Sequence, residues 1–434
     1  MRNIAFCKIY EVNMTNRIIV LVPILIIILL FQLAQAAPHF DLEMTGPEYL
    51  KLIEARKTTV MQINDEPSID PKESEKLEKY LEFGKRNLMW IDAINSKRTG
   101  TQKLSISSAA TAQGYPISNP RMLNFKSIET EWSNLSQLLP PELKKVIFDN
   151  APISATAPLS DREMIEWLIQ VDRAYRDAAR YTLLAPYKET MAQGRSDDVR
   201  GYVQIRDNAN INEQLRQWNS LDERTKNSLK KSLLMICFNT VRSDSYCSDF
   251  FASNEKSNTL VSFKDTFIQR AKAQYDGFFE IPVMRNDYTW LNENTLQLPF
   301  ANPKNDQIMN FLKVNIEDEY KWKNWKLNLK FVDTNSKNTT HVVFVPGVTP
   351  RVNGLGGSEI TMDSNSLISE YDIQWTIRHE YGHVLGLRDC YIEFYDEELE
   401  SFISYQLDVT NFMCSRRGKF KQLHYDKLMK VYKK

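Results

Sequence analysis

The 434-residue sequence lacks net charge, a second long apolar run and an internal repeat. Its 55 Lys and Arg residues balance 55 Asp and Glu residues, which argues against a nucleic-acid-binding protein because phosphate contacts call for a basic domain. With 42% hydrophobic and 25% charged residues, the composition also excludes a disordered, collagen-like or polytopic membrane protein. At roughly 100 to 200 residues per domain, this length predicts two or three domains.

The single long apolar run lies at the N-terminus. Arg17 precedes apolar residues 18–31, and the Ala-Gln-Ala stretch at 34–36 has the small residues that a signal peptidase recognises. We therefore expect residues 1–37 to be a secretory signal peptide, and the mature protein to be extracellular or periplasmic without stable membrane association. The run is shorter than the roughly 20 residues of a membrane-spanning helix, and Pro23 interrupts it. An uncleaved membrane anchor is the alternative.

Cysteine is scarce, and four cysteines remain once the predicted signal peptide, with Cys7, is removed. In an oxidising compartment four cysteines predict two disulfides, for which three pairings are possible. Proximity in the sequence favours Cys237 with Cys247 and Cys390 with Cys414. Four free buried thiols are the alternative. No cysteine pair has zinc-finger spacing with a histidine pair.

Residues 38–270 predict a mostly helical N-terminal domain, or two helical subdomains, without a chemical signature. A cap residue followed by proline predicts a helix over 71–95. Ser160 and Glu163 form a capping-box pattern at the start of another amphipathic helix. Residues 97–121, rich in Ser, Thr, Gln and Gly, predict a loop or linker.

The pattern changes near Gly277, and residues 278–434 predict a separate α+β domain with the boundary at 270–278. The expected order is strand, strand, helix, strand, strand, strand, helix, which implies a mixed sheet packed on helices. The expected strands are 278–284, 295–298, 325–332, 340–345 and 359–362, and the first helix is 306–322. The apolar run 340–345 predicts a more fully buried strand than the half-buried one at 325–332.

Residues 379–389 read His-Glu-Tyr-Gly-His-Val-Leu-Gly-Leu-Arg-Asp and carry the chemistry of the sequence. His379 and His383 are four residues apart, so on a helix they differ by about 40 degrees in azimuth and about 6 Å in height, and both imidazoles can bind one metal ion. Glu380 projects from beside the first of them and can act as a general base toward a water at the metal. Histidine is scarce, five in 434 residues, and a chance His-Glu-x-x-His is expected in roughly 0.4% of such chains.

The third ligand follows from the end of that helix. Gly386 can adopt the left-handed conformation that ends a helix, which lets Asp389 turn back toward the metal. Two imidazoles, one carboxylate and a water are the donor set of a catalytic Zn²⁺ site. Because an Asp after a helix end is commonly a solvated turn residue, Glu398 is the alternative ligand. It lies in an acidic stretch that predicts a solvated helix face.

The stretch from His379 to Asp389, followed by Met413, resembles the metzincin clan of zinc metalloproteases. In most of the clan the third ligand is His, and Asp at this position looks like the snapalysin-type secreted bacterial proteases. The resemblance implies a metzincin-like mixed twisted sheet with an active-site helix and a C-terminal helix. It also implies a Met-turn beneath the zinc, to which residues 411–414 are similar. The family fold brings the segments of Cys390 and Cys414 together there, which implies that these two cysteines pair.

Two further segments are similar to parts of the same clan. Residues 344–347 and 356–363 resemble the upper edge strand that binds extended substrates, and an unpaired edge can accept a peptide as an added strand. Arg416, Arg417 and Lys419 follow the expected Met-turn, where the family builds its specificity pocket, so the resemblance implies a preference for acidic or polar side chains. The resemblance covers at most residues 278–434.

Together, the predicted signal peptide and the resemblance predict a secreted zinc-dependent endopeptidase that cleaves proteins or peptides, and we expect it to be a monomer. The alternatives are a gluzincin-like peptidase that uses Glu398, and a secreted binding module whose metal site is structural or vestigial. We expect residues 38–270 to be a prodomain of a zymogen, removed by cleavage within 255–278, where Ser253 to Asn258 predict an exposed polar loop. An accessory domain retained in the mature enzyme is the alternative.

Overall fold

The computed structural model describes residues 42–60, 69–106, 114–333, 338–346, 348–364, 368 and 371–433. The predicted signal peptide lies outside these residues. The described residues all belong to one compact unit, Phe40–Lys434. Across the described ranges, no helix is both long and apolar enough to cross a membrane.

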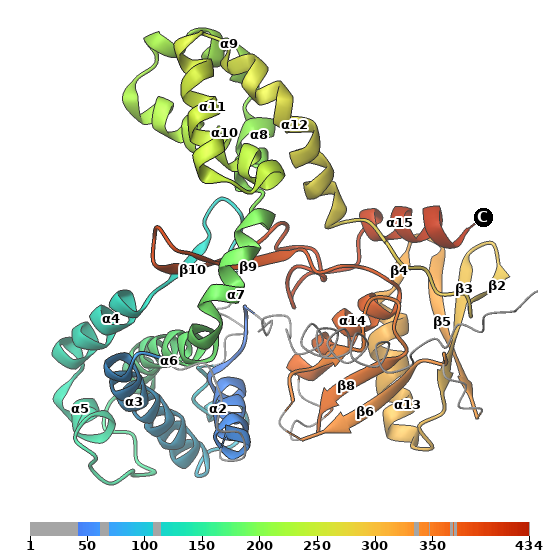
Figure 1. The fold of residues 1–434 in the computed structure, drawn as a ribbon. Coiled ribbons are helices and arrows are strands. Elements are labelled where there is room, and N and C mark those ends of the chain that lie inside the picture. Colours follow the sequence, from blue (N-terminus) through green and yellow to red (C-terminus); the bar gives the residue numbers. More distant parts are fainter. Residues whose placement is uncertain are drawn as a thin grey trace, which may run out of the picture. The chain divides into compact units, whose positions relative to one another are not determined.

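The N-terminal part of this unit is helical, as the sequence predicts (Figure 1). Asp70 caps the predicted helix over 71–95 by accepting hydrogen bonds from the amides of Lys72 and Glu73, and the capping box of Ser160 and Glu163 is present. The first helices are α2 (Gly46–Val60), α3 (Pro71–Asn95), α4 (Phe125–Leu138), α5 (Pro141–Ile147) and α6 (Asp161–Leu184).

A second group of helices follows, and its later members share an apolar core of their own. The elements in order are α7 (Lys188–Gln193), the 3₁₀ turn η3 (Gly194–Asp197), α8 (Arg200–Asp207), α9 (Ile211–Arg216), α10 (Glu223–Val241), α11 (Asp244–Lys256) and α12 (Leu260–Gly277). The core is built from residues of α8 to α12. Cys237 and Cys247 form a disulfide between α10 and α11, with 5.8 Å between their Cα atoms. The polar loop expected at 253–258 is mostly the end of α11, and only a short turn separates it from α12.

The C-terminal part is a mixture of strands and helices. Its strands are β2 (Thr289–Asn292), β3 (Thr295–Ala301), β4 (Lys321–Trp322), β5 (Trp325–Val332), β6 (His341–Val345), β7 (Arg351–Val352) and β8 (Glu359–Asp363). Their order is β2-β3-β5-β4 in one sheet and β6-β8-β7 in another, with β3–β5 and β6–β8 parallel. A bridge between Phe300 and Thr340 links the two sheets.

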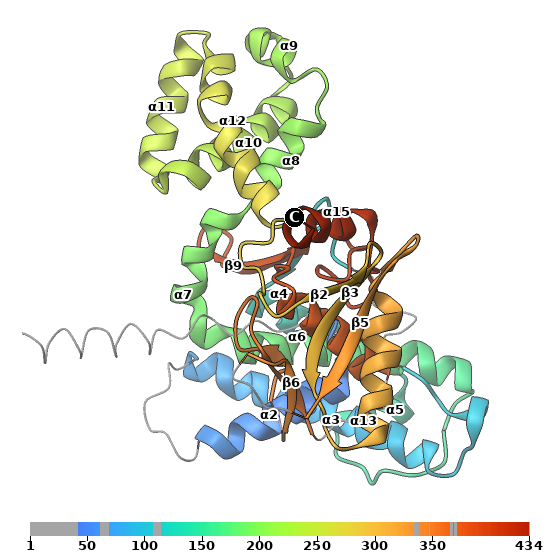
Figure 2. The same ribbon diagram turned by 90° about the vertical axis from the view of Figure 1, so that its right-hand side faces the viewer.

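Helices cover this mixed sheet and complete its core (Figure 2). Leu298 of β3, Leu312 of α13 (Asp306–Leu312) and Ile377 of α14 (Tyr371–Val384) are completely buried in one apolar cluster. The C-terminal helix α15 (Gln422–Tyr432) contributes Leu428 to the same cluster. The general α+β prediction is therefore correct, with α14 as the helix that carries residues 379 and 383.

Two local predictions were wrong, and a third overestimated the length of a helix. Residues 278–284 form no strand, because Phe278 and Phe279 belong to the turn that ends α12 and Pro282 has no amide hydrogen to donate to a neighbouring strand. The helix predicted over 306–322 is helical through residue 319, and its last two residues form β4, which pairs with β5. Strand β6 is half-buried rather than fully buried, because only β8 pairs along its length.

A hairpin after Asp389 was also not predicted. Strands β9 (Tyr391–Asp396) and β10 (Ser401–Gln406) are antiparallel, and β1 (Arg121–Leu123) from the helical part pairs with β10. Ile392 and Phe394 are buried while their neighbours are less so, which is the two-residue period of a strand. The acidic stretch that predicted a helix face is the turn of this hairpin, and Glu398 is exposed in it.

Candidate metal centre

Helix α14 ends as the sequence predicts, in a turn built on Gly386. This residue has φ +85°, a conformation that glycine adopts without a steric penalty. Its amide donates to the carbonyl of His383 at 3.0 Å, and the amide of Leu387 donates to the carbonyl of Gly382 at 2.9 Å. A Cβ at position 386 would lie 2.1 Å from the Val283 carbonyl oxygen. The turn therefore requires glycine, and it redirects the chain toward the helix.

The turn brings Asp389 against the two histidines of α14. Asp389 Oδ1 lies 3.0 Å from His379 Nε2 and 3.3 Å from His383 Nε2, and the two Nε2 atoms are 3.2 Å apart. Within the part of the chain that the structure describes, this is the group of His, Cys, Asp or Glu side chains that could hold a metal ion. Glu398, the alternative ligand, is not part of it.

The other ring nitrogen of each histidine is fixed by a backbone carbonyl. His379 Nδ1 donates to the carbonyl of Phe412 at 3.0 Å, and His383 Nδ1 donates to the carbonyl of Leu387 at 2.9 Å. Because carbonyl oxygens only accept, these bonds place the proton of each neutral ring on Nδ1 and direct the Nε2 lone pair toward the shared position. This is the orientation that metal-bound imidazoles need.

The spacing of the three donor atoms fits a tetrahedral zinc ion. Donors at about 2.0–2.1 Å from a tetrahedral zinc lie about 3.3–3.4 Å from one another, and the three measured separations are 3.0, 3.2 and 3.3 Å. Two imidazoles and one carboxylate also match the donor types that zinc prefers. The residues present therefore fit this metal without rearrangement.

The charges of the cluster are strongly coupled. Burial lowers the pKa of His379, but the hydrogen bond and charge of Asp389 outweigh it and raise that pKa to about 9. For His383 too, burial is outweighed by the Asp389 charge, so the pKa is raised. Burial raises the pKa of Asp389, whereas the two histidines lower it well below its usual range. Asp389 is therefore ionised at neutral pH and available as an anionic ligand.

Glu380 lies next to His379 on α14 and is 6% exposed. Its negative charge contributes to the raised pKa of both His379 and His383, so it lies near the three donors without being one of them. This is the arrangement predicted for a general base, which must approach the metal without binding it.

The turn at 411–414 lies beneath α14. A Cβ on Gly382 would meet the Met413 sulfur at 2.3 Å, so Met413 packs directly against the helix backbone between the two histidines. Asn411 Oδ1 accepts from the Met413 amide at 2.8 Å. The neighbouring carbonyl of Phe412 is the one that orients His379. The turn thus supports the first histidine from below.

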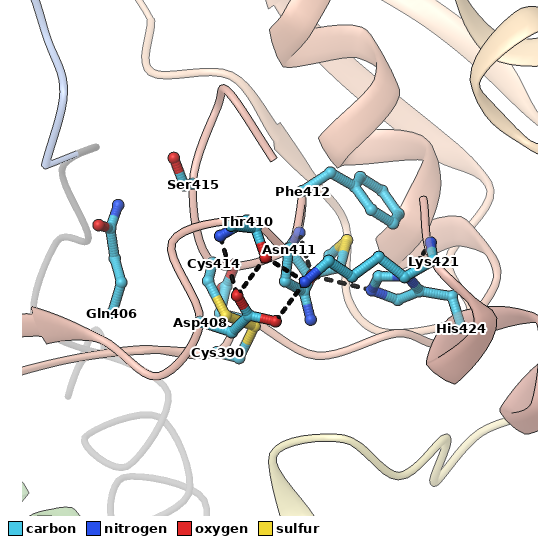
Figure 3. Close-up of a disulfide and its surroundings, with 12 residues drawn as sticks. Cys390, Gln406, Asp408, Thr410, Asn411, Phe412, Cys414, Ser415, Lys421 and His424 are labelled. Carbon is cyan, nitrogen blue, oxygen red and sulfur yellow. Dashed lines mark hydrogen bonds and ion pairs between the residues drawn. A yellow bond between two sulfur atoms is a disulfide. The ribbon is translucent and has the colours of Figure 1, made fainter. Parts of the chain in front are cut away.

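A buried histidine that the sequence did not reveal stabilises this turn (Figure 3). His424 of α15 is 3% exposed. Its Nδ1 accepts from the Lys421 amide at 2.9 Å, so its Nε2 carries the proton and donates to Asn411 Oδ1 at 2.8 Å. Burial, and then the Lys421 charge, lower the pKa of His424 to about 3. A lone histidine has no spacing signal, so only the fold identifies it.

The disulfide Cys390–Cys414 joins the third-ligand segment to this turn (Figure 3). Its Cα atoms are 4.5 Å apart, and the Cys390 amide donates to the Met413 carbonyl at 3.1 Å. Both cysteine pairs favoured by the sequence are therefore present.

The cations after the turn are already engaged. Arg416 forms an ion pair with Glu48 of α2 at 2.7 Å. Lys419 lies 3.6 Å from Glu319 and 5.2 Å from the centre of the Trp375 ring. Because neither offers an unpaired charge, they give no support to the expected preference for acidic substrates.

The sheet β6-β8-β7 has two edge strands, β6 and β7. Residues 359–363 form β8, which has a partner on both sides and is not an edge. The other expected segment begins at Phe344, near the end of β6, and so starts on an edge strand. The second edge is β7, which pairs antiparallel with β8 through Arg351 and Val352. Strand β7 has two residues, too few for a recognisable sequence pattern.

Comparison with known proteins assigns no relative. No family model matches the chain, and no curated protein or solved structure matches it. An assignment of function therefore depends on the geometry of the His379, His383 and Asp389 cluster and on the residues around it.

Proposed function

We propose that the protein is a secreted zinc-dependent endopeptidase, in which His379, His383 and Asp389 hold the metal and Glu380 is the general base. The observation that carries this proposal is the triangle of donor atoms, with separations of 3.0, 3.2 and 3.3 Å and each imidazole oriented by a carbonyl. The metzincin-like motif in the sequence supports the same reaction.

In this proposal each residue of the site has one task. Zinc, when bound, supplies a Lewis acid that polarises the scissile carbonyl and lowers the pKa of a water. The Glu380 carboxylate takes the proton from the attacking water and delivers it to the leaving amine. The Phe412 and Leu387 carbonyls keep both imidazoles in the tautomer that presents Nε2, and Asp389 lowers the net positive charge of the site compared with a third histidine.

The substrate in this proposal is an extended peptide. Strand β7 follows β6 and pairs antiparallel with β8, which leaves its outer edge available within the sheet β6-β8-β7. Backbone hydrogen bonds to such an edge recognise a peptide as an added strand without requiring a particular sequence. This mode of recognition suits an endopeptidase with protein substrates.

The binding-module alternative requires a structural metal site. Structural zinc sites have four protein ligands, whereas catalytic sites have three and leave a position for water. Within the described ranges three donors gather, and Glu380 lies beside them, which favours a catalytic site. The gluzincin-like alternative is disfavoured because Glu398 is exposed in the turn of the β9–β10 hairpin.

The proposal is tested by measuring zinc content and casein cleavage on the same purified protein. We expect about one zinc per chain, cleavage that a chelator abolishes, and recovery when zinc is restored. A zinc-loaded protein that cleaves neither casein nor a mixture of unstructured peptides would favour the binding module, and a protein that takes up no zinc would refute both.

A further inference from the structure

We propose that the helical region, residues 42–277, is a permanent part of the enzyme that holds the segment carrying Asp389, rather than a prodomain. The link to the metal rests on the proposed function, whereas the permanent association does not. The relevant contacts converge on the hairpin β9–β10, which begins two residues after Asp389, and on the residues after Cys414.

The helical region first completes the sheet of the hairpin. Strand β1 pairs with β10 in the register Arg121 to Ser404 and Leu123 to Phe402. All six residues of β10 are buried, and the Phe402 ring packs edge-on against Tyr181 of α6, with 5.8 Å between ring centroids. Without the helical region, β10 would present an apolar strand with a free edge to solvent, which favours aggregation.

A buried ion pair joins the helical region to strand β9. Arg180 of α6 pairs with Glu393 of β9, and their side chains are 1% and 2% exposed. Arg180 Nη1 also donates to the hydroxyl of Tyr49 in α2 at 3.1 Å. Removing the partner of a buried charge is strongly destabilising because that charge stays desolvated. Glu393, only four residues after Asp389, would lose its cation if the helical region left.

The residues just before α8 contact both strands of the hairpin. The Tyr405 hydroxyl of β10 donates to Asp198 Oδ1 at 2.9 Å and accepts from the Val199 amide at 3.0 Å. Val199 is completely buried in a small apolar cluster with four hairpin residues, which are Ile392, Phe394, Ile403 and Tyr405. The contact is thus both polar and apolar.

A third set of contacts holds the end of β10 and the residues that follow Cys414. Glu43 is 5% exposed and accepts hydrogen bonds from Gln406 and from Ser415, and Glu48 pairs with Arg416. Gln406 ends β10, and Ser415 follows Cys414. The helical region therefore holds both segments that the Cys390–Cys414 disulfide joins.

These contacts distinguish a permanent domain from an inhibitor. A prodomain must leave the enzyme folded when it departs, and an inhibitory one covers the metal. Across the described residues, the gathered donors include none from the helical region. The helical region instead pairs with buried charges and covers apolar side chains of the α/β region, and its departure would leave both without partners. We therefore favour the retained alternative over the prodomain expected from the sequence.

The test cuts the connection and asks whether the two parts separate. A site for a sequence-specific protease is inserted after Pro282, which is exposed in the segment between α12 and β2. The matched control carries the same insertion between Ser257 and Asn258, in the exposed turn between α11 and α12. After complete cleavage, both proteins are analysed by size-exclusion chromatography and for zinc content.

We expect both cut proteins to elute at the size of the intact chain, with zinc retained in the same proportion as before cleavage. If the Pro282 variant separates into two folded pieces, or if its C-terminal piece alone becomes more active than the intact chain, the region is a prodomain and the proposal is wrong. Co-elution is measured without reference to peptidase activity, so failure of the proposed function leaves this result interpretable.

The buried ion pair provides a second test in the cut protein. Arg180→Met leaves Glu393 buried without its cation, and we expect the two pieces to separate at lower urea concentrations and the zinc affinity to fall several-fold. In the double variant Arg180→Met with Glu393→Leu no charge is left buried, so we expect both values to recover. Equal separation in the single variant, the double variant and the parent would contradict the positioning role.

Discussion

The two regions of the chain differ in what their sequences reveal, although the structure makes them depend on each other. In the α/β region, residues 278–433, eleven consecutive residues contain all three gathered donors and the neighbouring Glu380. In the helical region only capping and amphipathic patterns are visible, yet Arg180 and Glu43 lie in buried contact with the segments around the metal centre. A metal site whose donors lie close together in the sequence can be recognised from the sequence alone. Contacts made by residues far away in the sequence can be recognised only from the structure.

Removing a donor histidine is the change with the largest expected effect. We expect His383→Ala to reduce bound zinc from about one per chain to nearly none, because two donors cannot replace three at a tetrahedral site. His341→Ala is the control, since His341 of β6 is not in the donor cluster. Full zinc content in His383→Ala would show that the protein does not hold its zinc through His383.

The two candidate third ligands should differ clearly in their effect on zinc affinity. We expect Asp389→Ala to weaken zinc binding by at least about 100-fold, more than the loss of an outer-shell partner. Glu398→Ala should leave the affinity unchanged because Glu398 is exposed in the hairpin turn. A competition titration with a chelator measures the zinc affinity of both variants. A larger loss of affinity in Glu398→Ala than in Asp389→Ala would favour the gluzincin-like alternative.

Substitution of Arg180 tests whether the helical region stabilises the α/β region. We expect Arg180→Met to lower the free energy of unfolding by about 3–5 kcal/mol, because Glu393 is then buried without a partner. Lys79→Met is the control, since its pair with Glu75 is exposed on α3 and should have little effect. Urea unfolding of the parent and both variants measures these free energies. Equal unfolding midpoints for the parent and Arg180→Met would show that the ion pair does not couple the helical region to the α/β region.

His424 should give a smaller effect with a distinct pH signature. We expect His424→Phe to cost about 1–3 kcal/mol at neutral pH, because Asn411 loses a buried hydrogen bond. The pKa of His424 is lowered from 6.5 to about 3 in the folded protein, so the unfolded chain binds more protons, and stability falls as the pH drops from about 6.5 toward 3.

The variant lacks this group, so its stability should decline less steeply over that range. Unfolding measured at several pH values compares the two slopes. Parallel curves for the parent and His424→Phe would show that His424 does not support the turn at 411–414 as a buried neutral side chain.

Local signals predicted a large part of the fold. The helix over 71–95, its cap at Asp70 and the end of α14 at Gly386 follow from residues within a few positions of each other. The hairpin β9–β10 was not predicted, because its acidic turn around Glu398 has the composition of a solvated helix face. The partner that keeps Glu393 of β9 buried is Arg180, 213 residues away in the sequence, so no local pattern indicates that this acid is buried. Strand β1 has three residues and its partner β10 lies far along the chain, so no local pattern could identify their pairing.

Glu380 provides the most direct test of the proposed function, because it separates chemistry from metal binding. We expect Glu380→Gln to keep the fold and about one zinc per chain but to lose nearly all casein cleavage, since the amide cannot take a proton from water. Zinc content and cleavage rate are measured on the same sample beside the parent. Cleavage at the parental rate by a zinc-loaded Glu380→Gln protein would contradict the account.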